Sequence, residues 1–288
     1  MFIRKMGVIN ITPDSFSDGN QYNKHQSFAD KFREIQTWAQ IIDIGAESTA
    51  PFNDAVVDTE ELKRFEQVFF PFLESNPDPE IYISIDSYKL ETFRIVFEKI
   101  KTHWPKTKVV FNDVSGKLED ELLAFLNQNP EIVYVFCHNL CPDRVSTGRH
   151  MDYVSKVSPN QFLVSIVDYF KKGLERLKDL DNEIWIDPCF GFSKTRKQNH
   201  FLISHFKSFL LQIPYEISCV VGLSRKSFLR VPKDADIKTP QGLVNVEQVH
   251  SNILFYLFRS PLKRELIVRT HDPAPIDNAQ NSLNFFEV

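Results

Sequence analysis

Short runs of β-branched residues recur along the chain at fairly regular intervals, and segments with helical periodicity separate them. This alternation is typical of βα units that assemble into a parallel sheet. Each run is followed by a polar or glycine-containing turn. The sequence predicts eight strands, near residues 3–10, 40–45, 81–86, 108–112, 132–137, 184–187, 218–223 and 265–270.

The segment after the first predicted strand carries a clear helical stripe. Its apolar residues recur at helical spacing, at Phe28, Phe32, Ile35 and Ala39. Ser27 precedes the stripe and is a residue type that favours the N-cap position. We therefore expect a helix here that packs on the outside of the sheet, with Ser27 as its cap.

The segment after the second predicted strand has the same character. Leu62, Phe65 and Phe69 fall on one face of a helix, and Thr59 stands where an N-cap is expected. This segment is predicted to form a second outer helix.

Eight parallel strands close into a TIM-type barrel in chains of about 250 residues, and this chain has 288. The competing architecture, an open doubly wound sheet, usually shows a glycine-rich phosphate turn after its first strand, and the chain has no GxGxxG or P-loop motif. We predict α/β class, with residues 1–288 forming a single (β/α)8 TIM-barrel domain. Its active site should lie on the loops at the carboxyl ends of the strands.

Composition narrows the function classes. The residues are 42% hydrophobic and 25% charged, and the net charge of -4 arises from interspersed acidic and basic residues, so nothing favours nucleic acid as a partner. No stretch approaches the roughly 20 apolar residues of a membrane span, and the amino-terminal apolar run is too short for a signal peptide. We expect a cytoplasmic protein with no membrane partner. Its four cysteines, none in a CxxC pair, are expected to be reduced thiols.

Polar residues stand where the predicted strands end, at the expected barrel mouth. A cluster of polar side chains destabilises a fold unless each one is hydrogen-bonded or in contact with water, so it indicates a polar ligand. The residues are Asn10, Asp43, Asp86, Asn112, His138, Asp187, Lys226, Arg269 and His271. A single Asp or Asn at a strand end more often caps a helix or completes a turn. We expect this structural role for Asp43, which precedes Gly45 and would bond neighbouring backbone.

Strand periodicity predicts which of these side chains point together. Residues i and i+2 share a face, which pairs Arg269 with His271 and Ser224 with Lys226. An arginine beside a histidine makes a natural anion site, with a phosphate or pyrophosphate as the simplest occupant.

A second group suits a flat heterocycle with amino donors and a carbonyl acceptor. The Asp187 carboxylate accepts two parallel N–H bonds, the Asn112 amide matches a donor and acceptor pair, and the Lys226 ammonium donates to an oxygen or ring nitrogen. Phe192 would stack on the ring. A pterin or a guanine-like base fits this set.

The remaining polar and cysteine residues receive simpler interpretations. Cys137, His138 and Cys141 contain zinc-ligand residue types, but Cys137 and His138 are neighbours on a strand and face opposite ways, so we expect no zinc site. Lys194 and Arg196 are expected to be solvated loop charges.

An ordered set of motifs resembles the dihydropteroate synthases and spans nearly the whole chain. The motifs are MGVINITPDSFSDGN (6–20), DIGAEST (43–49), SIDSYK (84–89), FNDVSG (111–116), IDPCFGFSKT (186–195), GLSRKSFL (222–229) and VRTHD (268–272). The resemblance implies a TIM barrel, usually dimeric, that joins 7,8-dihydropterin-6-ylmethyl diphosphate to 4-aminobenzoate and releases pyrophosphate in folate synthesis.

The resemblance also implies roles for individual residues. The pterin would contact Asp86, Asn112, Asp187 and Lys226, with Phe192 nearby. Pyrophosphate would meet Asn10, Arg269 and His271, and Mg²⁺ would be held in part by Asn10. The aminobenzoate would contact Phe16, Thr49, Pro51 and Ser224. Catalysis would be mostly electrostatic, through Asn10, Lys226, Arg269 and His271 around the departing anion and the pterin.

The sequence departs from the family pattern in several places. Ala50 stands where the second loop usually carries an arginine, which removes a charge-assisted contact of roughly 1.5–3 kcal/mol. Cys189 and Ser193 replace glycines of the sixth-strand motif. Two alternatives to a synthase therefore stay open. One is a paralogue that binds pterin without catalysing the condensation, and the other is a methyltetrahydrofolate:corrinoid methyltransferase, whose first loop does not carry TPDSFSDG.

Overall fold

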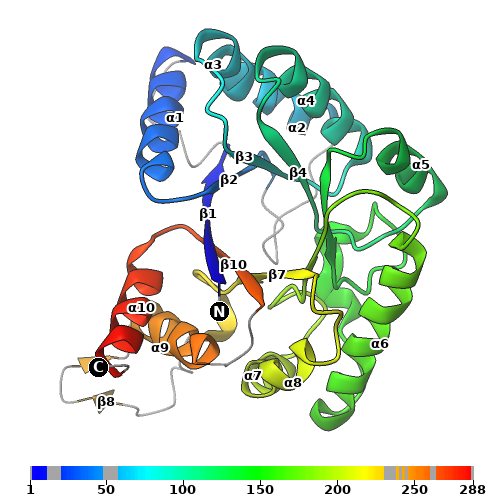
Figure 1. The fold of residues 1–288 in the computed structure, drawn as a ribbon, viewed down its shortest axis with the longest axis vertical. Coiled ribbons are helices and arrows are strands. Elements are labelled where there is room, and N and C mark those ends of the chain that lie inside the picture. The colour runs from blue at the N-terminus through cyan, green and yellow to red at the C-terminus, as the bar shows by residue number, and fades with distance from the viewer. Residues whose placement is uncertain are drawn as a thin grey trace.

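Eight strands of the computed structural model close into a parallel barrel, as predicted (Figure 1). The structure describes residues 2–11, 21–47, 58–229, 238–239, 242–243, 246–259 and 264–286. Around the barrel the order is β1-β10-β7-β6-β5-β4-β3-β2, and β2 pairs with β1 to complete the ring. The barrel strands are β1 (Phe2–Asn10), β2 (Ile41–Gly45), β3 (Tyr82–Asp86), β4 (Lys108–Asp113), β5 (Val133–Cys137), β6 (Ile184–Asp187), β7 (Ser218–Gly222) and β10 (Glu265–Thr270).

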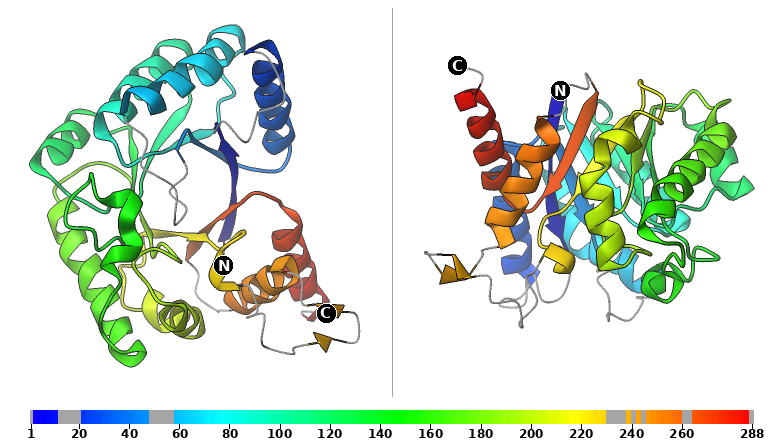
Figure 2. Two further views of the ribbon diagram at one scale, coloured as in Figure 1. Left: turned by 180° about the vertical axis from the view of Figure 1, so that it is seen from behind. Right: turned by 90° about the horizontal axis from the view of Figure 1, so that it is seen from below.

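Helices form an outer ring around these strands, visible from both ends of the barrel in Figures 1 and 2. They are α1 (Gln21–Gln36), α2 (Asp58–Arg64), α3 (Phe70–Ser75), α4 (Leu90–His103), α5 (Asp120–Gln128), α6 (Pro159–Leu177), α7 (Arg196–Ser204), α8 (Phe206–Leu210), α9 (Val246–Phe258) and α10 (Ala274–Phe286). Shorter helical turns are η2 (Phe65–Phe69), η3 (Thr147–Tyr153) and η4 (Ser227–Leu229). The (β/α)8 architecture is thereby confirmed, whereas the single domain over residues 1–288 stays a prediction.

The two predicted helix caps are wrong. Ser27 lies in the middle of α1, which begins six residues earlier at Gln21. Thr59 is the second residue of α2. In both cases the apolar stripe marks only the part of the helix that packs on the barrel, because the stripe reports burial and not helix length.

Helix α2 continues through the π-helical turn η2 into α3. The backbone N–H of Phe70 donates to the carbonyl of Phe65, five residues back, and Pro71 follows, which has no N–H to donate. Phe65 and Phe69 are fully buried on the barrel side, as the stripe predicted, while Leu62 is only half-buried.

Strand alternation divides the core into two layers. Side chains of one parity, such as Ile83, Phe111 and Val268, pack outward against the helices. Side chains of the other parity, such as Val110 and Trp185, fill the barrel interior. The interior parity continues to the carboxyl ends of the strands, where it places the polar residues at the mouth.

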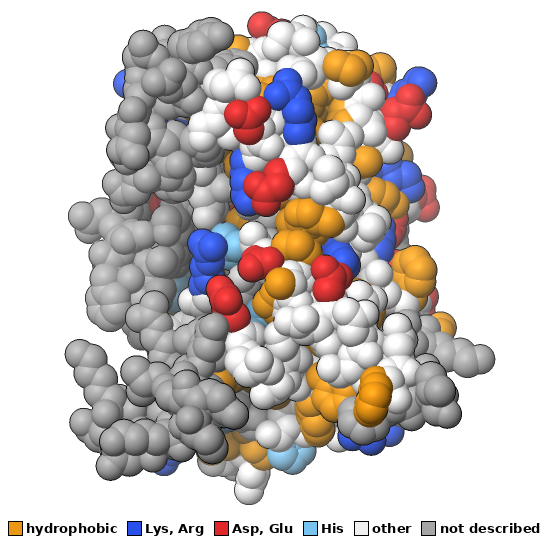
Figure 3. All heavy atoms as spheres, turned by 90° about the vertical axis from the view of Figure 1, so that its left-hand side faces the viewer, with side chains coloured by type: hydrophobic (Ala, Val, Ile, Leu, Met, Phe, Trp, Pro, Cys, Tyr) orange, Lys and Arg blue, Asp and Glu red, His pale blue; other side chains and the backbone are white. Residues whose placement is uncertain are grey.

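A two-stranded antiparallel ribbon, β8 (Lys238–Thr239) with β9 (Gly242–Leu243), follows the seventh barrel strand and was not predicted. It lies outside the helix ring (Figure 1). On the face shown in Figure 3, acidic and basic side chains of the described residues are interspersed. Within the described part of the chain, every helix is too short or too polar to cross a membrane.

Candidate active site

A pocket opens at the carboxyl ends of the barrel strands. Its lining comprises Asp86, Asn112, Val114, Asp187, Cys189, Phe190, Phe192, Gly222, Ser224, Lys226, Arg269 and His271. The side chains that the sequence assigned to the heterocycle and to the anion therefore line one shared pocket.

Arg269 is held at the centre of this pocket by two carboxylates. Its Nε donates to Oδ2 of Asp43 at 2.7 Å, and its Nη2 donates to Oδ2 of Asp86 at 2.6 Å. Burial disfavours the charged guanidinium, but the carboxylates of Asp43 and Asp86 keep the pKa of Arg269 above its ordinary value. The cation predicted to receive an anion is thus paired with two carboxyl groups of the protein.

Asp43 does not bond its neighbouring backbone, so the structural interpretation of this residue is wrong. It is fully buried and accepts hydrogen bonds from Ser84 Oγ at 2.6 Å, Asn112 Nδ2 at 3.2 Å and Arg269 Nε at 2.7 Å. By accepting one N–H of Asn112, Asp43 fixes the orientation of that amide, and it also orients the guanidinium. Asp43 is thus a positioning residue for two pocket side chains.

The second carboxylate partner of Arg269 has a strongly perturbed pKa. Burial raises the pKa of Asp86 to about 7, Arg269 and Lys226 oppose this shift, and Asp43 adds to it. Gly45 lies beside Asp86 in the sheet, and a Cβ there would come within 3.5 Å of the Asp86 carboxylate. Such a carboxyl group in a cleft is typical of a functional site.

Asp187 and Lys226 also line the pocket. Oδ1 of Asp187 accepts the backbone N–H of Cys189 at 2.6 Å, which fixes the carboxylate. Burial raises the pKa of Asp187 and lowers that of Lys226. The Lys226 Nζ lies 4.9 Å from the centre of the Phe192 ring, and the His150 imidazole stacks on that ring at 3.9 Å. In this structure Phe192 therefore supports Lys226.

Ser224 and His271 contact each other directly. The Ser224 Oγ accepts the backbone N–H of His271 at 3.3 Å and lies 3.1 Å from its Nδ1. We assign the Ser224 hydroxyl as the donor to Nδ1 of His271, because its oxygen already accepts the backbone N–H. Nδ1 is then the acceptor, so the proton of the neutral imidazole lies on Nε2. Burial, followed by the charge of Arg269, lowers the pKa of His271 to about 3. His271 is consequently a neutral hydrogen-bond donor at physiological pH.

His138 does not join the ring of polar groups at the mouth. It has the outward strand parity and packs against the rings of Phe162, Tyr169 and Phe170 on α6. Its Nδ1 lies 2.9 Å from Nζ of Lys194. Burial, followed by the charge of Lys194, lowers the pKa of His138 well below its ordinary value.

Lys194 is not a solvated loop charge, although Arg196 is exposed as expected. Its buried Nζ donates to the carbonyl oxygens of Cys189 at 3.0 Å and Phe192 at 2.9 Å. Burial lowers the pKa of Lys194 to about 7. Lys194 therefore secures the loop that carries the two pocket residues Cys189 and Phe192.

A buried charge cluster, which the sequence gave no reason to expect, lies at the start of the second loop. Lys89 Nζ donates to Glu47 at 2.6 Å and lies 3.3 Å from Glu61, and the Tyr88 hydroxyl donates to Glu47 at 3.0 Å. Burial raises the pKa of Glu61. The cluster anchors the chain beside DIGAEST, and only the three-dimensional fold brings its members together.

The predicted aminobenzoate contacts Phe16, Thr49 and Pro51, and Ala50, lie outside the described residues. Asn10 ends β1 beside Gly45 and has the interior parity of Met6, although it is not part of the pocket lining described above.

Comparison with known proteins places this pocket in a family. The profile of the family described as "Pterin binding enzyme" matches residues 6–256. The dihydropteroate synthase of Streptococcus pyogenes serotype M3 is 32% identical over 225 residues, which cover 77% of this chain and 74% of that protein. The dihydropteroate synthase of Clostridium beijerinckii is 29% identical over 228 residues, covering 78% and 75%.

Solved structures show the same fold. Dihydropteroate synthase from Anaplasma phagocytophilum, with bound 6-hydroxymethylpterin-monophosphate, has a TM-score of 0.73 at 22% identity and covers 99% of this chain and 100% of its own. The enzyme from Xanthomonas albilineans, with 4-aminobenzoic acid, has a TM-score of 0.72 at 22% identity and covers 100% and 94%. The chain belongs to the family of pterin-binding enzymes to which the dihydropteroate synthases are assigned.

Proposed function

We propose that the chain is a dihydropteroate synthase, a transferase that condenses 7,8-dihydropterin-6-ylmethyl diphosphate with 4-aminobenzoate and releases pyrophosphate. The observation that carries this proposal is the shared pocket, which is lined by Asp187, Asn112 and Lys226 together with Arg269 and His271. A flat donor-rich ring and an anion fit into it together. The relatives named dihydropteroate synthase support the same reaction.

In this proposal the pterin wall orients the substrate. The Asp187 carboxylate, fixed by the Cys189 N–H, accepts the amino and ring N–H groups of the pterin, and Lys226 donates to an acceptor on the ring. Asn112 keeps one N–H for the ligand after bonding Asp43, and its carbonyl oxygen, which accepts from the Cys137 thiol at 4.0 Å, still has a second lone pair to offer. Rigid polar partners of this kind hold the reacting carbon in place while water is excluded.

Arg269 and His271 stabilise the departing anion. Arg269 supplies positive charge, and neutral His271 donates through Nε2. The oxygen of Asn10 suits Mg²⁺, which takes few protein ligands and completes its shell with water and phosphate oxygens. When bound, Mg²⁺ would neutralise charge on the pyrophosphate. We also propose that the chain acts in the cytoplasm and that it forms a homodimer, the latter because the family resemblance implies it. Sulfonamide-type mimics should compete with 4-aminobenzoate.

The test is pyrophosphate release from the purified protein given dihydropterin diphosphate, 4-aminobenzoate and Mg²⁺. We expect release that depends on both substrates. Tight pterin binding without release would contradict the synthase and favour the alternative, a pterin-binding paralogue, for which the replacement of the second-loop arginine by Ala50 is the specific argument.

The variant Lys226→Ala tests the pocket itself. Because a charge-assisted hydrogen bond contributes about 1.5–3 kcal/mol, pterin affinity should fall by about 10- to 100-fold. Lys207→Ala, at an exposed position on α8, is the matched control and should bind like the unaltered chain. Unchanged affinity in Lys226→Ala would show that the pterin lies elsewhere.

A further inference from the structure

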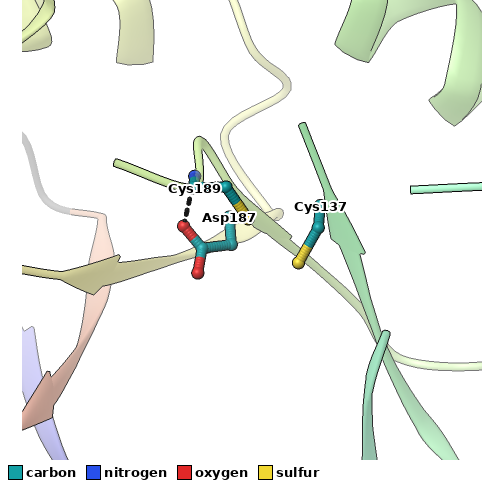
Figure 4. Close-up of side chains that lie close together, drawn as sticks. All are labelled: Cys137, Asp187 and Cys189. Carbon is teal, nitrogen blue, oxygen red and sulfur yellow. Dashed lines mark hydrogen bonds between the residues drawn. The ribbon is translucent and has the colours of Figure 1, made fainter. Parts of the chain in front are cut away.

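Two thiols and one carboxylate converge where β5 and β6 end (Figure 4). Cys137 and Asp187 are register partners on these adjacent strands, and Cys189 lies two residues beyond Asp187. The three side chains are buried, and their ligand atoms all lie within 4.8 Å of one another. Asp187 and Cys189 line the pocket, whereas Cys137 belongs to the interior core.

Cys189 occupies a backbone conformation that disfavours a side chain. Its φ is 48°, in the left-handed region where glycine is the usual residue. The family resemblance implies glycine at this position. Cysteine therefore occupies a position whose backbone conformation favours glycine, and its thiol points toward Cys137.

The proposed synthase reaction gives neither thiol a role. Burial raises the pKa of Cys137 well above its ordinary value, and the hydrogen bond with Cys189 adds to this shift. The Cys137 sulfur is therefore a neutral thiol without a cation. Their geometry, not their reactivity as free thiols, is what distinguishes the pair.

We propose that Cys137, Asp187 and Cys189 form a binding site for a thiophilic divalent cation such as Zn²⁺. Thiolate and carboxylate groups are both ligands of this ion, and three protein ligands leave the fourth position open to water from the pocket. With bonds of about 2.0–2.3 Å, tetrahedral ligands lie about 3.5–3.8 Å apart, so side-chain movements of roughly 1 Å close the site.

Charge balance favours the bound state. Each thiol loses its proton to solvent as its sulfur–metal bond forms, so one cation releases two protons and no electron is transferred. Two thiolates, one carboxylate and a divalent cation carry one net negative charge. The Lys226 ammonium, which interacts electrostatically with both Cys189 and Asp187, balances it.

The cation and the pterin cannot both use Asp187. A metal-bound Asp187 no longer accepts the pterin N–H groups, so the ion acts as a competitor of pterin. The competition rests on the proposed function, whereas the metal site itself stands independently of it.

The first experiment titrates the reduced full-length chain with Cd²⁺ alone, following thiolate-to-metal ultraviolet absorption and proton release. We expect one ion per chain and about two protons per ion. Even outer-shell partners change metal affinity by about 10–100-fold, so loss of a ligand in Cys189→Gly or Cys137→Ser should weaken binding by at least about 100-fold. Cys189→Gly also suits the left-handed backbone and should fold.

The matched control is Cys141→Ser. Cys141 is also a buried thiol, but it donates to the carbonyl of Ser146 and lies outside the cluster. Cd²⁺ binding should be unchanged in this variant. Equal affinity in Cys189→Gly and the unaltered chain, or loss of binding in Cys141→Ser, would overturn the site.

The second experiment titrates 6-hydroxymethylpterin with and without Zn²⁺. This pterin lacks phosphate, so it does not chelate the ion through a diphosphate. We expect Zn²⁺ to weaken pterin binding in the unaltered chain and to leave it unchanged in Cys189→Gly. Simultaneous binding of both would contradict the competition, and a failure to bind pterin in any condition would contradict the proposed function while leaving the Cd²⁺ result intact.

Discussion

At the scale of single residues, Asp43 shows how a buried carboxylate organises a site without lining it. It accepts from Ser84, Asn112 and Arg269, and each of these donors comes from a different strand. The sequence presents Asp43 as an ordinary strand-end acid because none of these partners is near it along the chain. Its importance arises only when the barrel closes and β10 is brought next to β1.

Replacing Asp43 by Asn should destabilise the protein. The amide carries no charge for Arg269 and directs a donor at one of its present donors. Breaking a buried ion pair costs about 3–5 kcal/mol, and the remaining contact of Arg269 with Asp86 places the expected loss near 3 kcal/mol. Urea unfolding measures it, with Asp30→Asn in an exposed pair of α1 as the control. A loss no larger than that of the control would refute the role of Asp43.

Pterin affinity should depend on pH through Asp86. Because burial raises the pKa of Asp86 to about 7, this group takes up a proton as the pH falls below that value. If the pterin binds the carboxylate form, affinity falls toward tenfold per pH unit below pH 7. Titrations of 6-hydroxymethylpterin on both sides of pH 7 test this, and the slope should flatten in Asp86→Asn.

Asp86 also affects the stability of the fold, but its contribution to stability falls as pH rises, whereas pterin affinity should increase. Between the ordinary aspartate pKa and about 7, the unfolded chain has lost this proton while the folded chain retains it. The contribution of Asp86 to the free energy of unfolding therefore decreases as pH rises through this window.

For pterin binding, a titration that keeps the same slope in Asp86→Asn would assign the pH dependence to another group.

At the scale of elements, the connection between β6 and α7 shows how an irregular segment is fixed. Three elements meet there: the loop itself, the end of β5 through His138, and α6 through the rings around His138. Cys189 and Ser193 keep left-handed backbone, with φ of 48° and 49°, at positions where the family resemblance implies glycine. Lys194 holds this connection together by contacts to Cys189, Phe192 and His138.

Lys194→Met should destabilise the protein and weaken pterin binding. The variant keeps an apolar stem of similar length but leaves two carbonyl oxygens without their donor, which costs about 1–3 kcal/mol for each unsatisfied group. Urea unfolding and pterin titration measure the two effects. Lys197→Met, on the exposed side of α7, is the control. Normal stability and affinity in Lys194→Met would mean that the loop is held by its other contacts.

At the scale of the whole molecule, the two ends of the barrel have different tasks. The mouth carries the pocket, while Arg4 lies near the opposite end. Its Nη2 donates to Glu265 at 2.5 Å, joining the first and last strands, and its guanidinium lies 4.9 Å from the Tyr82 ring and 4.8 Å from the Trp185 ring. One side chain therefore contacts residues of β3, β6 and β10 from β1.

Arg4→Met should reduce stability and leave ligand affinity unchanged. The variant keeps the apolar stem but removes the cation from Glu265 and from both rings, so a loss of about 2–3 kcal/mol is expected. Urea unfolding should record this loss, and a pterin titration should show no difference from the unaltered chain. Weaker pterin binding without a loss of stability would contradict this separation of the two ends.

The sequence predicted the barrel well because each strand and each outer helix has its own local pattern. All eight barrel strands lie within one residue of their predicted bounds. The failures concern contacts between elements. His138 faces outward because a shift of one residue reverses the face of a strand side chain, and Lys194 is buried because a loop and a helix cover it. The Asp43 network has no local signature, because its members come from four different strands. Of the three proposed metal ligands, Asp187 and Cys189 are close in sequence, but only strand pairing brings Cys137 to them.

The two carboxylates that hold Arg269 also set a threshold for any anion that enters the pocket. A ligand must offer the guanidinium more than Asp43 and Asp86 already do. We expect a multiply charged diphosphate to compete with two buried carboxylates far better than a monovalent ion such as chloride or acetate. The ion pairs of Arg269 would in this way make the pocket selective for highly charged anions.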